Sequence, residues 1–182
     1  MTFTIRDLSL DDIPALAHVL VTANEHAFRG LLPDETLDFP EAESAANWRS
    51  FLEGEGLPEG DFILIAQADG GEVVGYAWGG RNHKEQAFAG ELRQLNVLPA
   101  YQGRGIDRLL TCHLARRLAE QGISSLRVET LQINPNRLFY ERLGGIFVRE
   151  FPYEGDVFTV PAYVYGWADI RTLLDQCHPR RA

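Results

Sequence analysis

The sequence lacks the features of a secreted or membrane-bound protein. It holds no apolar run of about 18 or more residues, the length that a membrane-spanning helix needs. Its first residues show no basic start followed by an apolar stretch and a small-residue cleavage site, which a secretory signal peptide would have. We therefore expect a cytoplasmic protein with no membrane partner.

Cysteine is also scarce, because Cys112 and Cys177 are the only two. Two cysteines do not make a disulfide framework, and their scarcity suits a reducing compartment. Cys112 falls inside an expected helix, where a buried thiol is a more ordinary role than a nucleophile. Cys177 lies near the end of the sequence, with no base that the sequence identifies.

Positive charge is in short supply. Lys and Arg number 17 against 26 Asp and Glu, so the formal net charge is −9. Nucleic-acid binding needs clustered positive charge, so nucleic acid is excluded as the main partner. The histidines show no metal-ligand spacing with Cys or carboxylates, and we expect no metal. They are His18, His26, His83, His113 and His178.

The periodicity of the apolar residues predicts a mixture of helices and strands. A length of 182 residues favours a single domain over 1–182. Helices are expected over 13–26, 41–52, 106–121 and 135–143, and strands over 4–8, 62–67, 73–78, 91–97, 125–131, 146–148 and 158–167. The strand–turn–helix–strand unit at 91–131 should be parallel and right-handed, which predicts a mixed α/β or α+β domain.

The strand over 91–97 breaks its own alternation. Its apolar residues Leu92, Leu95 and Val97 include one step of three. A β-bulge would reset the facing there and splay the strand at a functional site.

The glycine turn over 102–107 precedes an amphipathic helix. Backbone N–H groups at a helix N-terminus bind phosphate or pyrophosphate, and Gly103 and Gly105 let the backbone approach such a group. A Walker A loop is excluded because no Gly-Lys-Ser/Thr end is present. A dinucleotide fingerprint is excluded because Arg108 stands where a third glycine would be needed.

Four segments, in the same order along the chain, carry a family resemblance. Gln102-Gly-Arg-Gly-Ile-Asp107, with its lead-in Val97-Leu-Pro-Ala-Tyr-Gln102, resembles the acyl-CoA loop of the GNAT superfamily of N-acetyltransferases. Asn134-Pro-Asn-Arg-Leu-Phe-Tyr-Glu-Arg-Leu-Gly-Gly145 is similar to a second segment of that family. Phe28–Pro33 and Tyr163–Asp169 look like one branch of it, so the resemblance covers nearly the whole chain.

The resemblance implies the GNAT fold, a mixed, mostly antiparallel and splayed sheet with helices on both faces. It implies transfer of an acetyl group from acetyl-CoA to the primary amine of a small molecule or peptide, by direct attack. The alternatives are a non-catalytic acyl-CoA-binding or sensor module, and a domain that has lost the cofactor. The aromatic residues Tyr163, Tyr165 and Trp167 are either core or the interface of a homodimer.

The same resemblance assigns the cofactor site. Backbone N–H groups of the glycine turn would hold the pyrophosphate, and Arg104 and Arg108 would attend the phosphates or form a solvated helix face. Main-chain groups of two strand residues would hold the pantetheine arm, and Asn134 is a further contact or a helix cap. The full set is Leu95, Val97, Gln102, Gly103, Arg104, Gly105, Ile106, Asp107, Arg108 and Asn134.

Two residues are candidates for catalysis. Tyr140 matches the family position that protonates the leaving thiolate, with a packed core aromatic as its alternative. Glu91 matches a carboxylate base that takes the proton of the ammonium through a water, with a surface-edge glutamate as its alternative.

The sequence departs from the family motif at one cofactor residue, and a cluster of acidic residues bears on the acceptor. Asp107 stands where the family has Gly or Ala, and its charge would repel a nearby pyrophosphate. The acceptor pocket is expected from residues 22–40, 82–90 and 151–160. Glu150, Glu154 and Asp156 favour a cationic acceptor.

Overall fold

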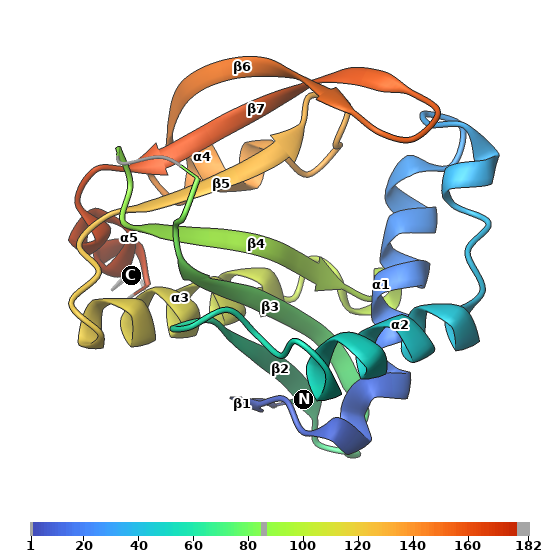
Figure 1. The fold of residues 1–182 in the computed structure, drawn as a ribbon. Coiled ribbons are helices and arrows are strands. Elements are labelled where there is room, and N and C mark those ends of the chain that lie inside the picture. Colours follow the sequence, from blue (N-terminus) through green and yellow to red (C-terminus); the bar gives the residue numbers. More distant parts are fainter. Residues whose placement is uncertain (1, 85–86, 178–182) are drawn as a thin grey trace.

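The computed structural model describes residues 2–84 and 87–177 of the chain (Figure 1). The strands are β1 (Phe3–Asp7), β2 (Phe62–Ala68), β3 (Val73–Arg81), β4 (Gly90–Val97), β5 (Leu126–Leu131), β6 (Ile146–Glu154) and β7 (Thr159–Trp167). The helices are α1 (Ile13–Phe28), α2 (Glu41–Glu53), α3 (Ile106–Glu120), α4 (Leu138–Arg142) and α5 (Ile170–Gln176). Within the described ranges, no helix is both long and apolar enough to cross a membrane.

All seven strands belong to one sheet, in the order β1-β2-β3-β4-β5-β7-β6. Every neighbouring pair is antiparallel except β4 and β5, which are parallel. The crossover between these two strands contains α3, as the unit at 91–131 predicts. The predicted class, a mixed and mostly antiparallel sheet with helices, is confirmed.

The sheet opens between β4 and β5. Their ladder has three residue pairs, ending at Leu92 and Val128, although both strands continue beyond it. Figure 1 shows the two strands diverging from there. The cause is seen in the pairing of β4 with its other neighbour, β3. Trp78 of β3 pairs with Gln94 and Gly79 pairs with Leu92, so Arg93 is an extra residue on β4. The predicted bulge is confirmed, and it bends β4 away from β5.

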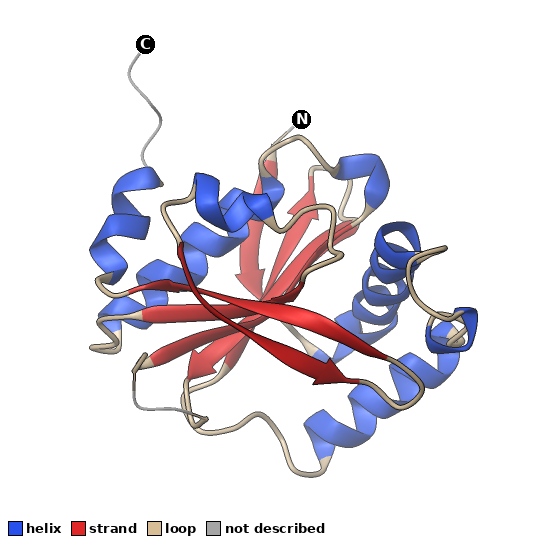
Figure 2. Cartoon of the chain, turned by 90° about the horizontal axis from the view of Figure 1, so that it is seen from above, coloured by secondary structure: helices blue, strands red, loops and turns tan. Residues whose placement is uncertain are grey.

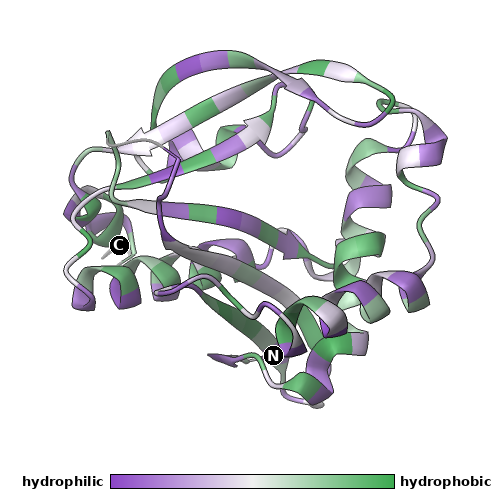
Figure 3. Cartoon of the chain, in the orientation of Figure 1, coloured by the Kyte–Doolittle hydropathy of each residue, from purple (hydrophilic) through white to green (hydrophobic). Residues whose placement is uncertain are grey.

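Helices cover both faces of the sheet (Figures 1 and 2). On one face α3 buries a stripe that includes Leu110, Leu114 and Leu118. On the other face, α1 and α2 pack residues such as Leu16 and Trp48 against β2 and β3. In Figure 3 β2 is largely hydrophobic, whereas β4 carries hydrophilic residues along its length. Polar side chains on a central strand need hydrogen-bond partners or a solvent-filled cavity beside them.

Several element boundaries differ from the prediction. The helix expected over 135–143 is shorter, because turns occupy the residues before Leu138. β6 runs to Glu154 because it follows β7 at the edge of the sheet, where exposed residues show no apolar alternation. α5 was missed, although Asp169 accepts a hydrogen bond from the main-chain N–H of Arg171 (2.9 Å) as an N-cap residue does. Tyr165 and Trp167 are buried, so they belong to the core.

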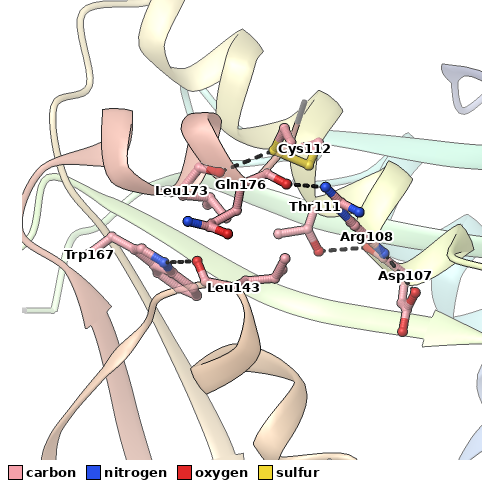
Figure 4. The surroundings of a disulfide bond; sticks show 9 residues. Asp107, Arg108, Thr111, Cys112, Leu143, Trp167, Leu173 and Gln176 are labelled. Carbon is pink, nitrogen blue, oxygen red and sulfur yellow. Dashed lines mark hydrogen bonds between the residues drawn. A yellow bond between two sulfur atoms is a disulfide. The ribbon is translucent and has the colours of Figure 1, made fainter. Parts of the chain in front are cut away.

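The expectation that Cys112 is a buried free thiol is wrong. The two cysteines are joined by a disulfide bond, with Cα atoms 5.7 Å apart (Figure 4). Cys112 lies on α3 and Cys177 directly follows α5. A separation of 65 residues gave no sign of proximity, because the missed helix α5 is what returns the chain to α3. Cys112 is buried, as expected, but not as a free thiol.

Candidate functional site

A cavity of about 460 Å³, here called the splay cavity, lies where β4 and β5 separate. One wall is α1, with Asn24 and Phe28. Gln94, Leu95 and Asn96 of β4 and Glu129 and Thr130 of β5 form a second wall. Tyr140 of α4 and the pair Tyr153 and Phe158, from the β6–β7 hairpin, complete the lining. The bulge at Arg93 thus creates the space in which these side chains face one another.

A second cavity of about 310 Å³, the loop cavity, extends the splay cavity toward the glycine turn. It reaches Val97, Gln102, Gly103 and Asp107. The lining residues shared by the two cavities are Asn24, Phe28, Leu95, Asn96, Asn134 and Tyr140. The two cavities therefore adjoin, and together they reach from the glycine turn to the opening between β4 and β5.

A third cavity, also of about 310 Å³ and here called the outer cavity, lies at the start of α3. Four of its lining residues belong to neither of the other two cavities: Gly105, Arg108, Leu143 and Gln176. It shares Gly103, Asp107, Phe139 and Arg142 with the loop cavity. The three cavities form a row past the N-terminus of α3.

The glycine turn has the backbone that an anion site needs. Gly103 and Gly105 have φ angles of +72° and +78°, a left-handed conformation that side chains other than glycine strain. A Cβ at either position would meet no atom, so conformation rather than space requires glycine there. The helix begins at Ile106, and the first N–H groups of a helix lack intrahelical acceptors. They can therefore bind a phosphate.

Asp107 already uses one of these groups. Its Oδ1 accepts a hydrogen bond from the main-chain N–H of Arg108 at 2.8 Å. Asp107 lines both the loop and the outer cavities. The conflict between its charge and a pyrophosphate stays a prediction, and the structure adds that one N–H donor of the helix start is already in use.

The two arginines near the turn differ in place. Arg104 donates to the carbonyl of Ala100 (3.1 Å) and lies over the ring of Tyr101, 5.2 Å from its centroid. It lines none of the three cavities. Arg108 lines the outer cavity and donates a hydrogen bond to the carbonyl of Gln176.

The remaining predicted cofactor residues gather around the loop cavity. Asn134 donates to Thr130 Oγ1 (3.0 Å) and accepts from the N–H of Asn136 (2.9 Å), so it is both a cap and a cavity-lining residue. Gln102 donates to the carbonyl of Val97 at 3.2 Å, closing the turn onto the end of β4. Ile106 is a core residue and lines none of the three cavities, so its role at the cofactor stays a prediction.

Tyr140 is buried but lies at the surface of two cavities. It is 8 % exposed and lines both the splay and the loop cavities. Burial raises the pKa of its phenol well above the ordinary value, and the charge of Asp107 raises it further. Across residues 2–84 and 87–177 the structure shows no hydrogen bond to its hydroxyl, which is protonated at neutral pH and available to donate.

Glu91 lies in a buried ion network. It is 1 % exposed and lines none of the three cavities. It pairs with Arg93, with Lys84 (Oε1 to Nζ, 3.1 Å) and with Arg127 (3.4 Å). Arg93 in turn pairs with the buried carboxylate of Asp61 at 2.7 Å. The pair between Glu91 and Arg127 therefore links β4 to β5 at the end of the opening where their ladder still holds.

Glu129 is a carboxylate of the site that sequence reasoning missed. It is the first residue of β5 after the ladder with β4 ends, and it lines the splay cavity. It pairs with Arg127 and with Lys84, whose Nζ lies 3.3 Å from its Oε2. The signal that could have found it is its position on β5 opposite the broken alternation of β4.

The predicted acceptor region is partly recovered. Residues of 22–40 and of 151–160 line the splay cavity, but none of the described part of 82–90 does, and residues 85 and 86 lie outside the description. Glu150, Glu154 and Asp156 do not line it. Tyr153 and Phe158 do, stacked with ring centroids 6.0 Å apart. The acidic residues of this segment therefore do not give the cavity its charge.

The described residues contain no group of three or more His, Cys, Asp or Glu side chains placed to hold a metal ion.

Comparisons with known proteins agree with this geometry. The profile of the Acetyltransferase (GNAT) family matches residues 28–145. The protein named "Uncharacterized N-acetyltransferase YuaI" of Bacillus subtilis (strain 168) is 28% identical over 180 residues, covering 95% of this chain and 99% of the relative. The "[Ribosomal protein bS18]-alanine N-acetyltransferase" of Haemophilus influenzae is 38% identical over 53 residues, 29% of this chain and 36% of the relative.

Two solved structures share the fold. The PaiA N-acetyltransferase of Thermoplasma acidophilum, in complex with coenzyme A, superposes with a TM-score of 0.67 at 18% identity, covering 91% of this chain and 98% of that one. The ribosomal-protein-S18-alanine N-acetyltransferase of Escherichia coli gives 0.64 at 22% identity, with 91% and 92% covered. The chain therefore belongs to the acetyltransferase (GNAT) family, and it is an acyl-CoA-dependent N-acetyltransferase.

Proposed function

We propose that this protein, as a single domain over residues 1–182, transfers the acetyl group of acetyl-CoA to a primary amine of a small molecule or peptide by direct attack. The observation that carries the proposal is the pair of adjoining cavities that reaches from the glycine turn to Tyr140 and Glu129. At one end they offer a site for an anion. At the other end they offer a proton donor, Tyr140, and a carboxylate that can take up a proton, Glu129. The solved relative in complex with coenzyme A supports acetyl-CoA as the donor.

The turn and its surroundings fit the cofactor. N–H groups between Gln102 and Asp107 would bind the pyrophosphate, and the main chain at Leu95 and Val97 would bind the pantetheine arm. Asn134 lies beside that path. Arg108 and Arg142 line the outer cavity and supply positive charge for phosphate groups. Arg104 lies outside the row of cavities, so its phosphate contact stays a prediction.

Tyr140 would act on the leaving group. The amine attacks the thioester carbonyl, the carbon–sulfur bond breaks, and the sulfur leaves with the electron pair. The phenol first donates a hydrogen bond to that sulfur, because its raised pKa makes complete proton transfer costly early in the step. The same raised pKa keeps the phenol protonated and ready throughout the neutral range.

Glu129 would receive the proton of the incoming ammonium, directly or through a water. It is the carboxylate whose side chain lines the splay cavity. A primary ammonium has a pKa of about 10.4, so attack at neutral pH requires a group close to the amine that accepts its proton. Glu91 stays a prediction for this role; it is 1 % exposed and does not line the splay cavity.

The cavity walls indicate the body of the acceptor. Phe28, Tyr153 and Phe158 give a largely aromatic wall, and Glu129 is the carboxylate in the lining. An amine carried by an apolar or aromatic group fits this combination better than a polycation does.

An acetyl-transfer assay over a panel of amines tests the proposal. The panel should contain aromatic and aliphatic monoamines, polyamines, lysine and peptides with free N-termini, with product identified by mass. Turnover of at least one amine, abolished or strongly reduced in Tyr140→Phe, is expected. Coenzyme A binding by calorimetry without turnover of any amine would instead support the non-catalytic acyl-CoA-binding module.

A further inference from the structure

The disulfide ties the end of α5 to the wall of the outer cavity. Cys177 directly follows Gln176, and its partner Cys112 lies one turn after Arg108 on α3 (Figure 4). Gln176 and Arg108 both line the outer cavity. The covalent bond thus fixes two lining residues that come from helices far apart in the sequence.

Within that wall, Arg108 donates a hydrogen bond to the main-chain carbonyl of Gln176. An arginine has several N–H donors in a planar fork, so this bond holds the guanidinium in one orientation at the cavity wall. A flexible side chain that is already ordered loses less entropy when a ligand binds. The tethered carbonyl therefore prepares Arg108 for an anion in the outer cavity.

The rest of α5 is held independently of the disulfide. Ile170 and Leu173 are buried in the core, and Asp169 caps the first turn of the helix. Breaking the disulfide would leave these contacts in place. It would free the last turn, which carries Gln176 and its carbonyl.

We propose that Cys112 and Cys177 form a thiol–disulfide switch that sets the affinity of the outer cavity for the phosphate groups of acetyl-CoA. The inference rests on the proposed function, because it concerns the regulation of that same site. The oxidised form binds the cofactor more tightly, since the tether keeps Arg108 and Gln176 in place. The reduced form binds it more weakly.

The chemical step is thiol–disulfide exchange with a dithiol. One thiolate of the dithiol attacks the Cys177 sulfur, the bond between the two cysteine sulfurs breaks, and Cys112 leaves as a thiolate that takes up a proton. The second thiol then displaces Cys177 as a thiol and closes the dithiol into its cyclic disulfide. Two electrons pass from dithiol to protein. Cys177 is the accessible end, because it is half-buried whereas Cys112 is 5 % exposed.

The experiment measures coenzyme A binding by calorimetry with oxidised protein, with protein reduced by dithiothreitol, and with Cys177→Ser. Alkylation and intact-mass analysis first establish the thiol count of each sample. Reduction and Cys177→Ser are each expected to raise the Kd about threefold to tenfold, the effect of disordering one or two flexible side chains. Faster amide hydrogen exchange over 170–177, with unchanged exchange over β2 and β3, should accompany it.

Dithiothreitol added to Cys177→Ser is the matched control and should change nothing further. Cys112→Ala, which removes the same bond from the α3 side, should reproduce the Cys177→Ser value. Equal Kd values for oxidised and reduced protein would overturn the switch while leaving the proposed function standing. Two free thiols in protein purified without reductant and exposed to oxygen would also overturn it. No coenzyme A binding in either state would overturn the proposed function and the switch together.

Discussion

The carboxylate of Asp107 accepts a hydrogen bond from the main-chain N–H of Arg108, 2.8 Å away, in the first turn of α3. This contact has two opposite consequences. A negative charge at a helix N-terminus stabilises the helix. The same charge takes an N–H group and adds repulsion at the place where the pyrophosphate would bind, and it raises the pKa of Tyr140 across the loop cavity.

Asp107→Asn should therefore tighten coenzyme A binding. Asparagine keeps an oxygen for the N–H of Arg108 but removes the charge. Two unit charges about 8 Å apart repel by about 2 kcal/mol at an effective dielectric constant of about 20, and salt screens this further. We expect a Kd about fivefold lower by calorimetry, with a loss of about 0.5 kcal/mol in the free energy of unfolding from the helix dipole. An unchanged or higher Kd would mean that the carboxylate is accommodated without cost.

Tyr140→Phe should lower kcat about 10²-fold, the low end for loss of a general acid. The KM for acetyl-CoA should change little, because the ring that packs against Phe139 is retained. Single-turnover and steady-state kinetics with the best amine of the panel provide the measurement. Turnover within about twofold of the original would remove Tyr140 from the acid role and leave it as a packed aromatic.

The ion pair between Arg6 and Asp12 gives a pH-dependent prediction about stability. Arg6 holds the pKa of Asp12 at about 2, below its ordinary 3.8. A lowered folded-state pKa contributes stability that is complete above the ordinary pKa and is lost as the pH falls through about 2. Asp12→Asn should cost about 2 kcal/mol in urea unfolding at pH 7, and the difference should shrink steadily between about pH 4 and pH 2. A pH-independent difference would assign the effect to packing instead.

Much of the architecture could be predicted from local pattern. The step of three between Leu92 and Leu95 was enough to place the bulge, because side chains in a strand alternate strictly and one extra residue must break that rule. The positive φ angles of Gly103 and Gly105 likewise follow from a turn that only glycine adopts easily.

What could not be predicted depends on distant segments. Glu129 becomes a cavity residue only because the ladder between β4 and β5 ends one position earlier, which no local pattern in β5 encodes. The disulfide required α5, a helix of seven residues whose stability comes from burying Ile170 and Leu173 rather than from helix propensity. Pairing of two cysteines 65 residues apart followed from that packing.

The two carboxylates near the opening of the sheet, Glu129 and Glu91, should respond differently to neutral substitution. Glu129→Gln is expected to lower kcat about 10²-fold near neutral pH, with the loss recovering as rising pH deprotonates the amine without help. Its folding stability should change by less than about 1 kcal/mol, because its pair with Lys84 is partly exposed and Arg127 keeps Glu91 as a buried partner.

Glu91→Gln is the matched comparison, since it removes a buried carboxylate partner from both Arg127 and Arg93, of which Arg93 keeps Asp61. We expect it to cost about 3 kcal/mol of folding stability, the loss usual when one member of a buried ion pair is removed. In the fraction that remains folded at low temperature, kcat per active site should stay within about threefold of the original. The opposite outcome, a stable Glu91→Gln with a large loss of kcat and a fully active Glu129→Gln, would return the base to Glu91. Thermal unfolding and pH–rate profiles of the two variants, measured side by side with one amine, therefore decide which carboxylate receives the proton.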